Sequence, residues 1–237
     1  MAMHPLDNVV WTALTTHQAS VALSEGMARR FPPEMAVFGA LALSLPPAWE
    51  SLARLANAPV GLYSTAPLSL PQGWAVTRHV ELLQMVQDDA KAASSDHGGE
   101  PSSAEPIETF ELKEADLPEM STLYSATRPG RTICPRIQKL GTFLGIREQG
   151  QLVAMGGMRL HVPGYREITT VATLPSHEGR GYATALVAAL VLAIREHKEQ
   201  PFLTVRTDNP RAIAIYQRLG FHERTRLHST TLTFAAK

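Results

Sequence analysis

The chain has 237 residues, of which 44% are hydrophobic and 19% charged, as in a folded globular protein with one large domain or two small ones. Lys plus Arg and Asp plus Glu both total 22, so the net charge is zero. No overall field therefore favours nucleic acid, an anionic membrane or a strongly acidic partner. The single cysteine, Cys134, excludes an internal disulfide and suits a reducing compartment.

The sequence carries no pattern typical of a metal site or a membrane span. Its nine histidines include no pair at positions i and i+4 and no Cys/His ligand spacing, so we predict no metal site. The longest apolar run, at 185–194, has about half the length that a membrane span needs. The first residues lack the basic region and apolar core of an export signal. We therefore expect a cytoplasmic protein with no nucleic-acid or membrane partner.

Residues 1–87 predict a small α/β module whose function no motif indicates. The segments 19–31 and 47–58 have the apolar spacing of amphipathic helices. VGLYST, at 60–65, is typical of a strand, and 74–85 fits either a strand or a helix.

Residues 88–106 separate this module from the rest of the chain. Apolar residues almost vanish there, and Ser, Gly, Pro and acidic residues dominate. Such a segment cannot bury enough apolar surface to offset the entropy of ordering it. We predict a flexible linker.

Residues 107–237 alternate strand and helix patterns and predict a second α/β domain. Period-two and β-branched runs indicate strands, whereas apolar residues at helical spacing indicate helices. Gln149-Gly150 and Pro163-Gly164 are turn signals between strands. The expected strands are 107–113, 142–148, 148–162, 166–174, 202–208 and 221–236, and the expected helices are 114–127, a short stretch before Gly141, 182–197 and 209–220. This order favours a mixed α/β sheet that starts antiparallel and becomes parallel.

HEGRGYATAL, at 177–186, places Gly179 and Gly181 directly before an apolar helix. Unsatisfied N–H groups and the helix dipole make such a helix start a phosphate-binding site, and glycine lets the backbone approach closely. Arg180 would add a positive charge. A tight turn with no ligand explains the same glycines equally well.

Two nucleotide-binding motifs fit this segment poorly. A dinucleotide fingerprint needs a third glycine where Thr184 stands and an acid about 20 residues later, whereas Asp208 lies further on. No Gly-Lys-Ser/Thr follows, so the P-loop pattern is absent. A dinucleotide-dependent oxidoreductase is thus the least favoured hypothesis.

The segment 178–183 resembles the pyrophosphate-binding motif of the GCN5-related N-acetyltransferase (GNAT) superfamily, Gln/Arg-x-x-Gly-x-Gly/Ala. Gly181 and Ala183 match that motif, and Glu178 departs from it. The superfamily's second motif is also present, with Asn209, Tyr216 and the pair Gly220-Phe221 in order. The resemblance covers 107–237 and implies the GNAT fold there. It leaves 1–87 unassigned, and a degenerate copy of the same fold is one hypothesis for that module.

The resemblance implies an N-acyltransferase that moves acetyl from acetyl-CoA to a primary amine in a ternary complex, without a covalent enzyme intermediate. Tyr216 would act on the coenzyme A sulfur, and Glu167 would be the general base. Asn209 would contact coenzyme A. The remaining residues expected to bind it are Val171, Ala172, Thr173, Glu178, Gly179, Arg180, Gly181, Tyr182, Ala183 and Thr184.

Each of these roles has a structural alternative. Tyr216 shares an apolar helix face and could belong to the core. Asn209 before Pro210 is a favourable helix cap. Glu167 could be a solvated glutamate at a strand edge. A non-catalytic coenzyme A-binding or scaffold module is therefore the second functional hypothesis.

The acceptor is the least defined part of the prediction. TRPG at 127–130 falls in the connection that borders the acceptor site in this superfamily, and it suggests the subgroup akin to the glycine N-acyltransferase C-terminal domain. Arg128 or Arg131 could bind an acceptor carboxylate. Small molecules and peptides carrying an amine remain open as acceptors, and a homodimer is compatible with the sequence.

Overall fold

A computed structural model describes residues 4–87 and 107–235; the predicted linker at 88–106 lies outside the described residues. In the first part the elements are α1 (Val9–Thr15), η1 (Ala19–Val21), β1 (Leu23–Glu25), β2 (Ala28–Arg30), β3 (Gly39–Leu41), α2 (Pro46–Leu55), β4 (Val60–Ser64) and β5 (Trp74–Val86). In the second part they are β6 (Phe110–Glu111), η2 (Glu114–Asp116), α4 (Leu117–Thr127), η3 (Ile137–Lys139), β7 (Phe143–Glu148), β8 (Gln151–Val162), β9 (Tyr165–Thr173), η4 (Pro175–His177), α5 (Tyr182–Glu196), β10 (Gln200–Arg206), α6 (Pro210–Arg218) and β11 (His222–Phe234).

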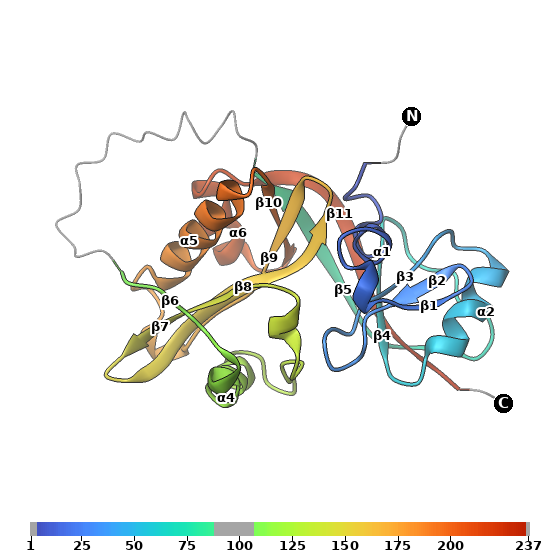
Figure 1. The fold of residues 1–237 in the computed structure, drawn as a ribbon, viewed down its shortest axis with the longest axis horizontal. Coiled ribbons are helices and arrows are strands. Elements are labelled where there is room, and N and C mark those ends of the chain that lie inside the picture. The colour runs from blue at the N-terminus through green and yellow to red at the C-terminus, as the bar shows by residue number, and fades with distance from the viewer. Residues whose placement is uncertain (1–3, 88–106, 236–237) are drawn as a thin grey trace.

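One eight-stranded mixed sheet forms the centre of the molecule, in the order β4-β11-β5-β10-β9-β8-β7-β6 (Figure 1). Its pairs are antiparallel except β9 and β10, which run parallel. The predicted fold class, a mixed α/β sheet, is confirmed, and the parallel pairing expected near the glycine turn is found in β9 and β10.

Strands β4 and β5 come from the first part of the chain, yet they lie within the large sheet. β5 is inserted between β10 and β11, where Leu82 pairs with both Arg206 and Leu227. The sheet thus runs across the predicted boundary between the two parts. The segment 74–85, for which strand and helix were both open, is a strand.

Helices α4 and α5 cover opposite faces of the sheet. They pack against neighbouring residues of β8, whose side chains point to opposite sides. Met155 packs with Leu123 of α4, whereas Ala154 packs with Leu186 of α5. The apolar helix α5 buries Leu190 and Ile194 against β8, β9 and β10. This double covering fixes the start of α5 beside the ends of β9 and β10, where the site lies.

The segment 19–31, predicted as a helix, is instead a short 3-10 turn followed by the hairpin β1–β2. Gly26 turns the chain with φ +42°, a conformation that ends any helix. Arg30 is fully buried, and its guanidinium donates hydrogen bonds to the carbonyl oxygens of Phe31, Leu55, Ala58 and Pro59. The helix predicted at 47–58 and the strand predicted at 60–65 are confirmed as α2 and β4.

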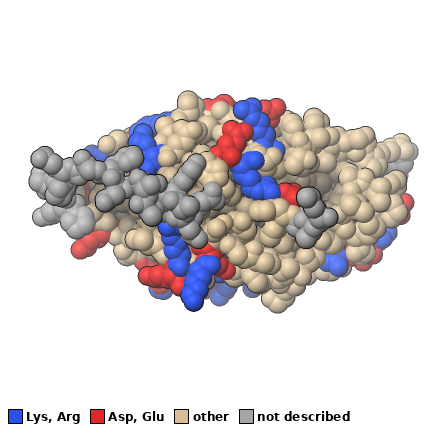
Figure 2. Space-filling model, turned by 90° about the horizontal axis from the view of Figure 1, so that it is seen from above, with Lys and Arg blue, Asp and Glu red and all other residues tan. Residues whose placement is uncertain are grey.

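The face in Figure 2 shows acidic and basic side chains interspersed among neutral ones, without a large area of one sign. This pattern agrees with the zero net charge of the sequence. None of the helices in the described ranges is long and apolar enough to cross a membrane.

Candidate active site

Strands β9 and β10 separate near the middle of the sheet. They pair only from Tyr165 with Gln200 to Ile168 with Leu203, although β9 continues to Thr173. At the point of separation Thr170 has φ +57°, which is strained for a β-branched residue. There β9 carries one residue more than β8 between the pairs Met155–Ala172 and Gly157–Thr169, as in a β-bulge. The split leaves the end of β9 open on its β10 side.

The glycine turn leads directly into α5 beside this split. Gly179 and Gly181 have φ of +82° and +84°, and Gly181 is the residue that precedes the helix. The first helical bond joins the Ala185 N–H to the Gly181 carbonyl oxygen. The N–H groups of residues 182–184 therefore have no acceptor within the helix, and no side chain caps them. This helix start is an open anion site.

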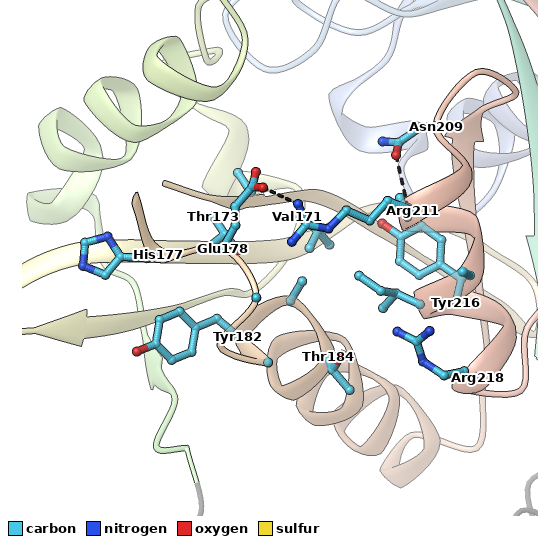
Figure 3. Close-up of a pocket in the computed structure, with 17 residues that line it drawn as sticks. Val171, Thr173, His177, Glu178, Tyr182, Thr184, Asn209, Arg211, Tyr216 and Arg218 are labelled. Atoms are coloured by element: carbon cyan, nitrogen blue, oxygen red, sulfur yellow. Dashed lines mark hydrogen bonds and ion pairs between the residues drawn. The ribbon is translucent and has the colours of Figure 1, made fainter. Parts of the chain in front are cut away.

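A groove of about 420 Å³ lies between the end of β9, the glycine turn, the start of α5 and one face of α6 (Figure 3). Within it the Thr173 hydroxyl is buried without a hydrogen bond to any described residue. An orphaned hydroxyl and free N–H groups suit a long polar ligand such as coenzyme A. Most of the predicted binding residues meet here: Val171, Ala172, Thr173, Glu178, Gly179, Gly181, Tyr182, Ala183, Thr184, Asn209 and Tyr216.

Tyr216 projects from α6 toward β9 at the inner end of the groove (Figure 3). Its ring packs edge-on against Phe221, and its hydroxyl has no hydrogen-bond partner among the residues described. Burial raises the pKa of Tyr216 to about 12, and the nearby Arg128 cation partly opposes this shift. The hydroxyl is therefore a proton donor at neutral pH that is free to bond a ligand. The ring is also part of the core, so both interpretations of Tyr216 hold at once.

Asn209 caps α6 and also lines the groove. Its side-chain oxygen accepts a hydrogen bond from the Ala212 N–H at 3.1 Å, with Pro210 at the first helical position. This geometry is the helix cap expected from the sequence. The cap orients α6 so that Arg211, Ile215 and Arg218 face the groove.

The positive charges of the groove come from α6 rather than from the glycine turn. Arg180 does not line the groove, because its Nη1 binds both carboxylate oxygens of Glu148 at 3.0 and 2.8 Å. Arg211 and Arg218 line it instead, and Arg211 pairs with Glu178. Neither arginine was predicted from the sequence. Their i and i+7 spacing on the helix that Asn209 caps is the signal that points to them.

Glu167, the predicted base, lies outside the groove. Its side chain is 0% exposed, and its two oxygens accept hydrogen bonds from Arg159 at 2.9 and 2.8 Å. Burial alone would lower the pKa of Arg159, but the Glu167 carboxylate raises it above its usual range. Glu167 is thus a buried, paired anion rather than a solvated glutamate at a strand edge.

Three arginines gather on the side of the split that faces α4. Arg128 ends α4 and donates a hydrogen bond from Nη2 to the Val171 carbonyl oxygen at 2.9 Å. The Arg131 N–H bonds back to the Arg128 carbonyl oxygen. Burial lowers the pKa of Arg78, on β5, and the neighbouring Arg131 lowers it further. Within 4–87 and 107–235 none of these three guanidinium groups has a carboxylate partner.

A separate polar cluster joins segments that are distant in sequence. The ligand atoms of His17, His161 and Glu199 lie within 4.8 Å of one another. The sequence spacing did not predict this arrangement. Arg166 donates from Nε to Glu199 at 3.0 Å and also contacts His161, so the cluster is an ion-paired network that ties β8, β9 and the start of β10 together.

Comparisons with known proteins agree with this architecture. The family model described as FR47-like protein matches residues 143–229. A solved structure from Novosphingobium aromaticivorans, assigned to the GNAT family of acetyltransferases, is 32% identical, with a TM-score of 0.83 over 99% of this chain and 100% of that chain. A GCN5-related N-acetyltransferase from Kribbella flavida has the same fold at 17% identity, with a TM-score of 0.62 over 97% of this chain and 96% of its own.

Curated relatives match over shorter ranges. Mycothiol acetyltransferase of Salinispora tropica is 32% identical over 113 residues, which are 45% of this chain and 37% of that protein. An uncharacterized protein of Mycobacterium leprae is 29% identical over 174 residues, which are 69% of this chain and 45% of that protein. This chain thus spans less than half of the length of these two curated relatives. Its match over the whole of the N. aromaticivorans protein shows that the chain belongs to the GNAT family of acetyltransferases.

Proposed function

We propose that the protein is an N-acyltransferase that transfers acetyl from acetyl-CoA to a primary amine by direct attack in a ternary complex. The observation that carries the proposal is the groove, where free N–H groups, an opened strand and a tyrosine hydroxyl lie along one path. Acetyl transfer named for the S. tropica relative agrees with it. The amine acceptor and the direct mechanism are part of the proposal.

Different residues of the groove would hold different parts of acetyl-CoA. The diphosphate would lie on the N–H groups of residues 182–184 at the start of α5. The pantetheine arm would follow β9, where the Thr173 hydroxyl and backbone groups left free by the split are hydrogen-bonding partners. The thioester would then lie near Val171, beside Tyr216.

Acetyl-CoA supplies an activated acyl group, and the protein positions it and handles protons. The amine nitrogen attacks the thioester carbonyl carbon, a C–N bond forms, and the C–S bond breaks. Tyr216 gives its proton to the departing sulfur, the proton lost by the amine passes to water, and Tyr216 then regains a proton from water. A backbone N–H of the open β9 segment stabilises the charge on the carbonyl oxygen. Glu167 would assist only through its effect on Arg159, since both of its oxygens are engaged.

The arginines beside the split favour an acceptor that carries an anionic group as well as its amine. Arg128, Arg131 and Arg78 bring positive charge to one place, and no described carboxylate neutralises it. A carboxylate can accept two parallel hydrogen bonds from a guanidinium. This placement supports the proposal of a subgroup similar to glycine N-acyltransferase. It also gives the first part of the chain a role, because Arg78 lies on β5.

Release of free thiol from acetyl-CoA tests the proposal. Purified protein is mixed with acetyl-CoA and a panel of amines that includes amino acids, their amides and simple alkylamines. We expect thiol release that depends on the amine and is fastest with amines that carry a carboxylate. Binding of acetyl-CoA without thiol release for any amine would instead favour a non-catalytic coenzyme A-binding module. Absence of coenzyme A binding would contradict both functions.

A further inference from the structure

Glu178 and Arg211 form an ion pair across the mouth of the groove. Glu178 ends the 3-10 turn before the glycines, and Arg211 lies in the first turn of α6. Both residues line the groove, and Figure 3 shows their side chains meeting in front of the β9 segment. The pair therefore joins the two elements between which a ligand must enter.

Glu178 is an unfavourable neighbour for an anionic ligand. It is the only carboxylate among the groove-lining residues in the described chain, and it lies four residues before Tyr182, where the helix that attracts phosphate starts. The GNAT motif described above has Gln or Arg at this position, so a negative charge replaces a neutral or positive side chain here. A phosphate that binds the α5 start meets this carboxylate and finds Arg211 already occupied by it.

The ion pair between Glu178 and Arg211 is exposed to solvent and can therefore be broken by a ligand. The side chains of Arg211 and Glu178 are 61% and 45% exposed, and water screens exposed pairs strongly. A phosphate offers several oxygens to a guanidinium and can therefore replace one carboxylate. Arg180 cannot supply this charge while both Glu148 oxygens hold it outside the groove. Arg211 is the cation that a small side-chain movement makes available at the turn.

We propose that Glu178 is a latch on Arg211, which holds the guanidinium while the groove is empty and releases it to a phosphate of the incoming donor. The inference rests on the proposed function, because it takes a coenzyme A thioester as the ligand. Glu178 then lowers donor affinity and Arg211 raises it. The exchange favours donors with phosphate groups over thioesters that lack them.

Isothermal titration of four proteins at one fixed ionic strength tests the latch: wild type, Glu178→Gln, Arg211→Gln and the double variant. The probes are coenzyme A and pantetheine, which lacks the phosphates. We expect Glu178→Gln to bind coenzyme A about 2- to 5-fold more tightly, and Arg211→Gln to bind it about 10-fold more weakly. The gain from Glu178→Gln should shrink in the Arg211→Gln background, because no cation is left to release. Pantetheine affinity should stay constant in all four proteins.

Glu25→Gln is the matched control, since it breaks an ion pair with Arg54 of similar exposure whose two residues do not line the groove. It should leave the affinity for coenzyme A near that of wild type. A weaker affinity in Glu178→Gln would mean that the pair only holds the turn in place, and it would overturn the latch. An equal change for pantetheine would overturn it as well. Failure of the wild-type protein to bind coenzyme A would overturn the proposed function itself, and the latch with it.

Discussion

Arg128 donates a hydrogen bond from Nη2 to the carbonyl oxygen of Val171 at 2.9 Å. This bond joins the end of α4 to β9 where β9 has separated from β10. The Arg128 guanidinium also lies close enough to Tyr216 for the two groups to affect each other's pKa. The proposed donor groove and the arginines proposed to face the acceptor therefore meet at Val171.

Replacing Arg128 by Lys keeps the charge but removes the planar fork that binds a carboxylate with two hydrogen bonds. We expect the KM for acceptors with a carboxylate to rise about 10- to 100-fold, the size of a lost charged hydrogen bond. The affinity for acetyl-CoA should change little. Arg136→Lys, at an exposed pair with Glu34, is the control and should leave both constants unchanged. An equal KM increase for amines without a carboxylate would contradict the acceptor assignment.

Removal of the Tyr216 hydroxyl should affect turnover rather than binding. Tyr216→Phe keeps the ring contact with Phe221 but removes the proton donor for the sulfur. We expect kcat to fall by about 10²- to 10⁴-fold, with coenzyme A affinity by titration close to that of wild type. Unchanged turnover would exclude Tyr216 from proton transfer and leave it with a packing role.

The raised pKa of Tyr216 also predicts a pH dependence of stability. Burial raises this pKa to about 12 in the folded protein, against about 10 in an unfolded chain. Above pH 10 the unfolded chain loses the proton first, so the stabilising contribution of Tyr216 is present below pH 10 and is lost as pH rises toward 12. The free energy of unfolding in urea should therefore fall less between pH 9 and pH 11 for Tyr216→Phe than for wild type. Equal falls would mean that the hydroxyl titrates normally.

Gly181 is needed for its backbone conformation rather than for space. A Cβ at this position would meet only the Ile107 Cδ1, at 3.6 Å, but φ is +84°. Gly181→Ala should therefore cost about 1–2 kcal/mol of stability and weaken coenzyme A binding as the turn relaxes. Gly164→Ala, with φ +77° and no atom within 4 Å, carries the same strain at the end of β9 opposite to the groove. Loss of coenzyme A affinity in both variants would show that the effect is general destabilisation.

The substitution Glu167→Gln tests whether Glu167 is the predicted base or a structural anion. The substitution leaves Arg159, whose side chain is 13% exposed, without its counter-charge. We expect the free energy of unfolding in urea to fall by about 3 kcal/mol. Unchanged stability together with a shifted pH profile of kcat would support Glu167 as the base instead.

Local features of the site were predictable from the sequence because neighbouring residues determine them. Gly179 and Gly181 provide the positive φ that the turn needs. Asn209 before Pro210 specifies where α6 begins. The spacing from Asn209 to Tyr216 then places the tyrosine on the groove side of that helix. The hairpins at Gln149-Gly150 and Pro163-Gly164 follow from turn chemistry in the same way.

Features that depend on distant partners were not predictable. The prediction of a helix at 19–31 was wrong because it relied on apolar spacing and gave too little weight to Gly26. In the structure Gly26 turns the chain between two strands. The sequence predicted Arg180 as the cation of the glycine turn, whereas the structure brings Arg211 to the groove. Their roles depend on which carboxylate each one reaches, Glu148 or Glu178. The burial of Glu167 depends on Arg159, on the neighbouring strand.

The sequence by itself thus determined the helix start with its glycine turn and the cap and tyrosine of α6, since backbone conformation and helical periodicity are local properties. Only the tertiary structure decided that β5 enters the sheet beside β10, that Arg211 rather than Arg180 faces the groove, and that Glu167 is buried in an ion pair. Strand order and ion pairing join residues far apart along the chain, and their free energy depends on burial that exists only after folding.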